Sequence, residues 1–166
     1  MDPVSVTTTI DVPRERVHDL LCDLAARPSF CDHFLSDYRL ERLDPVGVGA
    51  AARFRLGDSK QWMETTIEAA ERPHLVRERG RGGRLNRVPT ATVWELAPGP
   101  MTDSCEVTVT FWTEPAHLVD RIREALRRPR PGRRDWRRAL ERLRDLCESE
   151  RAPERVGVAG VSRVGV

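Results

Sequence analysis

The sequence lacks any apolar run approaching the roughly 20 residues that a transmembrane helix needs. Its start, Met1-Asp2-Pro3-Val4, also lacks the basic and then apolar pattern of an export signal. Cysteines are few and scattered, and most of them sit in apolar patterns. We therefore expect reduced thiols in a cytoplasmic protein without a transmembrane segment. The four cysteines are Cys22, Cys31, Cys105 and Cys147.

Motifs for common catalytic chemistries are missing too. There is no Gly-x-Ser-x-Gly nucleophile turn, no phosphate-binding loop and no dinucleotide fingerprint. The glycines of Gly80–Gly83 do not follow a parallel strand and precede a helix, so they do not indicate a phosphate site. Cys31-Asp32-His33 lacks a second pair of ligands, which argues against a metal site. The sequence thus predicts neither a metal nor another cofactor.

Charge is nearly balanced but uneven along the chain. The formal net charge is +2, and Lys60 is the only lysine among 28 basic residues. Residues 127–138 hold seven arginines and one aspartate, about +6, so the other 154 residues sum to about −4. This cluster fits either an adaptor that touches an anionic surface or a solvated break in a helix. Trp136 is the only aromatic residue within it and belongs to the apolar stripe of the last helix, so no specific nucleic acid is expected.

The sequence pattern predicts mainly strands in the first two thirds of the chain. Val4 to Val12 alternate with polar residues, which is typical of a half-buried strand, and Pro13 precedes a helix over 14–25. A second short helix is expected from Phe30 to about Phe34. Trp62 and Ile67 have opposite parity within one strand, which indicates either a bulge or a strand covered on both faces. The six further strands are expected at 36–44, 50–57, 60–71, 74–80, 86–97 and 104–113.

From Ala116 onward the period becomes helical. Trp136, Leu140, Leu143 and Cys147 form one apolar stripe, which must be buried against another element. The run Pro129–Gly132 breaks the helix, so we expect helices at 116–127 and 133–150 with a candidate hinge between them. Residues 1–150 are expected to form one domain, and 151–166 a disordered tail.

This order of elements, together with several short motifs, resembles the helix-grip fold of the START-like (SRPBCC, Bet v 1-like) superfamily. The closest resemblance is to its bacterial polyketide cyclase/dehydrase branch. It extends over about residues 4–150. The motifs are Thr9-Ile10-Asp11-Val12-Pro13 before a helix, the glycine turn Val46–Ala50, the proline hairpin Glu71–Val76 and the strand Val93-Trp94-Glu95-Leu96.

The resemblance implies an α+β fold in which a curved, seven-stranded antiparallel sheet surrounds an interrupted C-terminal helix. It also implies a cavity between sheet and helix for an apolar or amphipathic small molecule, lipid- or polyketide-like. The protein is expected to be a monomer or a homodimer. The residues expected to line the cavity are those that have inward parity and that the resemblance places at the cavity. These residues are Phe30, Phe34, Tyr38, Phe54, Ile67, Trp94, Val107, Val109, Trp136 and Leu140.

A polyketide cyclase or dehydratase is the alternative function, although the sequence favours a binding protein over an enzyme. Such an enzyme needs an acid and a base inside the cavity. Four residues could serve. Glu64 and Arg77 could form an inward ion pair, although the sequence favours a position on the solvent face for both. The four candidates are His33, Tyr38, Glu64 and Arg77.

Overall fold

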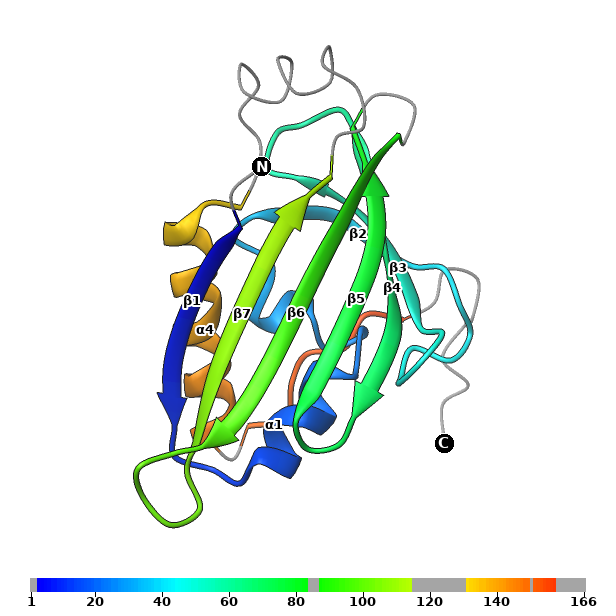
Figure 1. The fold of residues 1–166 in the computed structure, drawn as a ribbon. Coiled ribbons are helices and arrows are strands. Elements are labelled where there is room, and N and C mark those ends of the chain that lie inside the picture. Colours follow the sequence, from blue (N-terminus) through cyan, green and yellow to red (C-terminus); the bar gives the residue numbers. More distant parts are fainter. Residues whose placement is uncertain (1–2, 84–86, 115–130, 150, 158–166) are drawn as a thin grey trace, which may run out of the picture.

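The computed structural model describes residues 3–83, 87–114, 131–149 and 151–157 (Figure 1). Within them, seven antiparallel strands form one curled sheet in the order β1-β7-β6-β5-β4-β3-β2. The α+β helix-grip architecture is therefore confirmed. The strands are β1 (Val4–Ile10), β2 (Leu35–Leu40), β3 (Ala51–Leu56), β4 (Trp62–Glu71), β5 (Leu75–Gly82), β6 (Val88–Pro98) and β7 (Cys105–Thr113).

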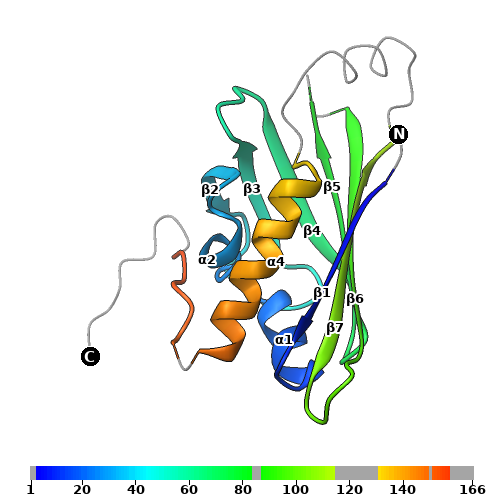
Figure 2. The same cartoon turned by 90° about the vertical axis from the view of Figure 1, so that its left-hand side faces the viewer.

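Among the described residues, three helices accompany the sheet: α1 (Arg14–Leu21), α2 (Pro28–Cys31) and α4 (Arg133–Glu148). Figure 2 shows α4 lying along the inner side of the curled sheet, with α1 near one end and α2 beside it. The predicted helix at 116–127 and the arginines of 127–130 lie outside the described residues. None of the described helices is long and apolar enough to cross a membrane.

Helix α4 packs as its apolar stripe predicts. Its buried side chains are Trp136, Ala139, Leu140, Leu143 and Cys147. The helix begins directly after Gly132, whose backbone N–H donates to the Asp135 carboxylate over 2.8 Å. An acidic residue in the first turn also suits the positive end of the helix dipole. The break at Pro131-Gly132 thus sets where α4 starts on the sheet.

The period-two pattern of the strands decides which side chains face α4. Trp94 and Leu96 of β6 are buried on the inner face, as are Val107 and Val109 of β7. The ring centroids of Trp94 and Trp136 are 5.6 Å apart, so the sheet and helix meet through these indoles as predicted. Trp112 has the opposite parity, and its indole N–H donates to Glu114 over 2.8 Å.

Strand β4 contains the predicted irregularity. Its register against β5 shifts between Ile67 and Ala69. Ile67 is completely buried in the core, whereas Trp62 lies opposite Arg55 and is only half-buried. Trp62 is therefore on the outer face and Ile67 on the inner face, as their opposite parity in a regular strand requires, and the register shift lies beyond both of them.

Residues 151–157 differ from the expected disordered tail. The Arg155 guanidinium lies 2.8 Å from the Asp23 carboxylate. The Ser29 hydroxyl donates to the Glu154 carbonyl over 2.7 Å, and the Val156 N–H donates to the Ala25 carbonyl over 3.0 Å. These contacts hold the segment against the connection between α1 and α2, where the sequence offers no periodic pattern. Residues 158–166 lie outside the described residues.

Candidate functional site

An interior cavity of about 40 Å³ lies between the inner face of the sheet and the start of α4. Most of its wall is apolar or aromatic, and threonine, glutamate and arginine side chains supply the polar part. Its volume suffices for water, but drug-sized ligands occupy pockets of roughly 300–1,000 Å³. The lining residues are Arg27, Cys31, Phe34, Leu35, Tyr38, Phe54, Leu56, Met63, Glu64, Thr65, Glu78, Thr90, Thr92, Phe111, Pro131 and Trp136.

A buried ion pair forms the polar part of the wall. A guanidinium nitrogen of Arg27 lies 2.7 Å from the Glu78 carboxylate, and the two side chains are 6% and 3% exposed. Arg27 comes from the segment before α2, and Glu78 from the middle of β5. A buried ion pair is costly to desolvate unless further hydrogen bonds satisfy both groups.

Most of those further hydrogen bonds are present, although the buried Nε atom of Arg27 has no hydrogen-bond partner among the described residues. The Trp94 indole N–H donates to one Glu78 oxygen over 2.8 Å, and the Thr65 hydroxyl donates to the other over 3.0 Å. Arg27 also donates to the Leu21 carbonyl over 3.0 Å. Its guanidinium carbon lies 5.5 Å from the Phe30 ring centroid and 5.1 Å from that of Trp94. The pair is thus fixed by both the sheet and the α1–α2 connection.

Aromatic rings make up the opposite wall. Trp136 lies 5.3 Å from Phe34 and 5.9 Å from Phe111, measured between ring centroids. Tyr38 and Phe54 stack with their centroids 6.0 Å apart. Such a wall is suited to apolar or planar groups of a ligand.

Tyr38 places its hydroxyl beside the α1–α2 connection. The hydroxyl donates to the Leu24 carbonyl over 2.8 Å. Burial raises the pKa of Tyr38 well above its usual value, so the phenol keeps its proton at neutral pH. Tyr38 is therefore a hydrogen-bonding group in the wall and not a base.

Four of the ten expected lining residues border this cavity: Phe34, Tyr38, Phe54 and Trp136. The other six lie in the surrounding hydrophobic core, where they support the wall without bordering the open space. They are Phe30, Ile67, Trp94, Val107, Val109 and Leu140.

Glu64 and Arg77, for which the sequence allowed an inward ion pair but favoured the solvent face, do not form a pair inside the cavity. Arg77 is exposed on β5, and Glu64 is half-buried at the border of both the cavity and a groove on the outer face. The pair that the structure brings together is Arg27 and Glu78. The inward orientation of Glu78 could have been predicted from the sequence, because Glu78 has the same parity as Val76, an apolar residue of β5 that is completely buried.

His33 lies beside α4 and away from the cavity lining. Its Nε2 atom is 3.0 Å from the Asp135 carbonyl oxygen, so it donates there in the matching tautomer. Its ring packs edge-on against Phe34 with centroids 4.9 Å apart. The geometry gives His33 a role in fixing α2 to α4. Within the described ranges, no three histidine, cysteine or acidic side chains gather as a metal site would require.

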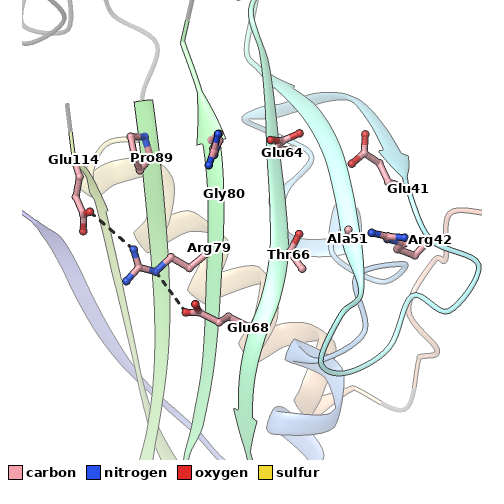
Figure 3. A pocket seen from close by; sticks show the side chains of 11 residues that line it. Glu41, Arg42, Ala51, Glu64, Thr66, Glu68, Arg79, Gly80, Pro89 and Glu114 are labelled. Carbon is pink, nitrogen blue, oxygen red and sulfur yellow. Dashed lines mark ion pairs between the residues drawn. The ribbon is translucent and has the colours of Figure 1, made fainter. Parts of the chain in front are cut away.

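The groove on the outer face is larger, about 810 Å³, and open to solvent. Figure 3 shows side chains of both charges along it, with Arg79 between Glu68 and Glu114. The Arg79 guanidinium lies 3.4 Å from the Glu68 carboxylate and 3.9 Å from that of Glu114. The groove thus presents both charges side by side and has little apolar surface for an apolar ligand.

Solved structures share this fold. Norcoclaurine synthase from Thalictrum flavum, in a truncated form, matches with a TM-score of 0.68 and 12% identity, over 90% of this chain and 95% of that one. KanY matches with a TM-score of 0.64 and 20% identity, over 89% and 98%. Protein CV1439 from Chromobacterium violaceum matches with a TM-score of 0.61 and 15% identity, over 90% and 100%.

Among curated protein sequences no match was found. At these low identities the structural matches show the fold alone. The family model described as "Polyketide cyclase / dehydrase and lipid transport" matches residues 1–148, nearly the whole described chain. The protein therefore belongs to the polyketide cyclase/dehydrase and lipid transport family.

Proposed function

We propose that the protein binds an apolar or amphipathic small molecule between the sheet and α4. One observation carries this proposal: an aromatic cavity wall meets a fully buried, hydrogen-bonded ion pair, Arg27 and Glu78. The apolar part of the ligand lies against Phe34, Phe54 and Trp136. Its polar end lies toward the ion pair and the neighbouring threonines. The membership in a family of cyclases and lipid carriers supports this assignment.

The ion pair as a whole is neutral, and this decides which polar group of a ligand can lie beside it. Arg27 and Glu78 neutralise each other, so a ligand carboxylate would enter without a counter-charge of its own. Burying an unpaired charge is far more costly than burying a hydrogen-bonded hydroxyl or carbonyl. The favoured ligand is therefore neutral, with a hydroxyl or carbonyl at one end of an apolar body.

Binding requires the cavity to widen, because about 40 Å³ holds no such ligand. Leu35, Tyr38, Phe54 and Met63 border the cavity and are only half-buried. Their side chains can turn outward with less loss of packing than the fully buried residues can. We assign the entrance to this side, between β2, β3 and the start of α4.

A cyclase or dehydratase is the second candidate on family grounds, but the groups at the cavity favour a carrier. Of the four tentative catalytic residues, only Tyr38 and Glu64 border the cavity. Tyr38 stays protonated, and Glu78 is already engaged by three hydrogen-bond donors. His33 and Arg77 lie away from the cavity, so the four candidate catalytic residues are not brought together there.

The test is native mass spectrometry of freshly purified protein, followed by titration with long-chain compounds of equal length that end in an alcohol, a ketone or a carboxylate. The expected result is a co-purified or titrated neutral ligand, with the carboxylate binding more weakly. Binding of none of the three compounds would contradict the proposal. Turnover of a bound polyketide-like compound, lost in Tyr38→Phe, would replace the carrier by the enzyme.

A further inference from the structure

Three arginines surround one indole on the outer face of β2, β3 and β4. The guanidinium carbons of Arg53 and Arg55 lie 4.4 and 4.5 Å from the Trp62 ring centroid, and that of Arg39 lies 5.7 Å from it. We call Arg39, Arg53, Arg55 and Trp62 the outer basic cluster. It occupies the edge of the sheet, because β2 is the last strand in the order.

The positive charge of this cluster is only partly compensated. Asp37 pairs with Arg55 over 3.0 Å. Across the described part of the chain, no carboxylate lies within ion-pair distance of Arg39 or Arg53. Arg53 lies directly opposite Arg39 of β2 on one side and opposite Glu64 of β4 on the other, so Arg39 faces a like charge that repels it, whereas Arg53 has one neighbour of each sign. An external anion between them would relieve that repulsion.

The outer basic cluster lies on the strands whose inward side chains line the cavity. Phe54 lies between Arg53 and Arg55 in β3 and points inward to the cavity, and Met63 follows Trp62 and does the same. The cluster is thus on the outer side of the strands that form the proposed entrance. In the neighbouring mixed groove of Figure 3, Arg79 by contrast lies between two carboxylates, those of Glu68 and Glu114.

We propose that the outer basic cluster docks the protein on an anionic phospholipid surface. Arg39 and Arg53 are exposed, so a single free anion would gain little from them. A bilayer offers many phosphate groups at once, which suits weak and repeated guanidinium contacts. RNA also presents phosphates, but the guanidiniums already stack on Trp62, which removes the aromatic surface that bases would use.

This inference goes beyond the proposed function, and it can be tested without any cavity ligand. The experiment is co-sedimentation of the full chain with vesicles of phosphatidylcholine alone or mixed in equal parts with phosphatidylglycerol. Binding is expected only to the anionic vesicles and should weaken as salt is added. The double variant Arg39→Gln/Arg53→Gln should bind about 25-fold more weakly, since each basic residue near such a surface contributes about fivefold.

A charge-matched control separates this site from the other arginines. Arg133 and Arg137 are exposed on α4, and Arg133→Gln/Arg137→Gln removes the same charge. Its binding should stay close to that of the unchanged protein, and thermal unfolding should show both variants folded. Equal loss in the two variants, or a loss confined to the α4 variant, would overturn the proposal. Tighter binding to single-stranded RNA that depends on Arg39 and Arg53 would overturn it as well.

Discussion

Glu78 of β5 accepts hydrogen bonds from Arg27, over 2.7 Å, and from the Trp94 indole on the neighbouring strand, over 2.8 Å. One carboxylate therefore joins the sheet to the segment between α1 and α2. The same carboxylate forms part of the cavity wall. Fold stability and the polar end of the proposed site depend on the same three residues.

Removing the Glu78 charge should destabilise the protein strongly. In Glu78→Gln, the Arg27 guanidinium remains buried without its counter-charge, for which a loss of about 3–5 kcal/mol in the free energy of unfolding is expected. Chemical denaturation measures this loss. Glu95→Gln is the control, because Glu95 is exposed on the adjacent strand, and it should change stability by less than about 0.5 kcal/mol.

The double variant Arg27→Met/Glu78→Met tests the cause of that loss. It removes both charges together and should be more stable than Glu78→Met alone, since no unpaired charge is left inside. If the double variant lost the sum of the two single losses, the ion pair would not be the reason for the destabilisation.

Gly80 should tolerate no side chain. A Cβ atom there would overlap the Glu64 carbonyl oxygen of β4 and lie 2.9 Å from the Thr90 hydroxyl of β6. Gly80→Ala should therefore push neighbouring strands apart and cost at least about 2 kcal/mol, in the range of overpacked cores. Gly157→Ala has open space around the new methyl group and should be neutral in the same thermal unfolding assay.

Trp136 should contribute far more to stability than Trp112. Its ring contacts Phe34, Trp94 and Phe111 and is 5% exposed. Trp136→Ala should cost about 3–5 kcal/mol, as do other large aromatic residues removed from a core. Trp112→Ala, on the outer face, should cost less than half of that. Equal losses would mean that α4 does not pack on the sheet through this indole.

The thiols should be unreactive at neutral pH and should affect stability only in alkali. Burial raises the pKa of Cys31 and Cys147 from 9.0 to about 12. Burial likewise raises the pKa of Cys22 and Cys105 from 9.0 to about 11. A thiol with a raised pKa in the folded state stabilises the fold fully below pH 9.0, and this contribution disappears as the pH rises toward the folded pKa.

The free energy of unfolding should consequently fall as the pH rises above about 9, the unfolded thiol value. A thiol reagent at neutral pH should label the native protein slowly and the unfolded protein rapidly. Rapid labelling of any one cysteine in the native protein would show that its side chain is not buried as described.

The sequence predicted the parts of the fold that repeat with a period. Thr92, Trp94 and Leu96 alternate with polar or smaller residues, and Trp136, Leu140 and Leu143 follow a helical spacing, so their burial could be predicted. Arg27 could not be placed, because it lies in a short connection where neither period applies. Its partnership with Glu78 depends on tertiary structure that joins residues 51 positions apart.

The parity of β5 could not be decided from its charged residues, for a physical reason. Arg77, Glu78 and Arg79 are consecutive charged residues, so polarity alone does not show which of them faces inward. Only the preceding Val76 sets the parity. In β4, Trp62 and Ile67 have opposite parity and lie on opposite faces. The register shift between Ile67 and Ala69 comes after Glu64, so Glu64 keeps the parity of Trp62.

The central claim, ligand binding between the sheet and α4, is tested most directly by filling the cavity. Leu56 lines the cavity, and Val93 lies on the outer face of β6. Leu56→Phe and Val93→Phe each introduce a phenyl ring, and only the first enters the proposed site. The measurement is the affinity for the neutral long-chain alcohol or ketone, with unfolding curves to confirm that both variants are folded. The account predicts at least a tenfold weaker affinity, about 1.4 kcal/mol, for Leu56→Phe and an unchanged affinity for Val93→Phe. Unchanged affinity in folded Leu56→Phe would contradict it.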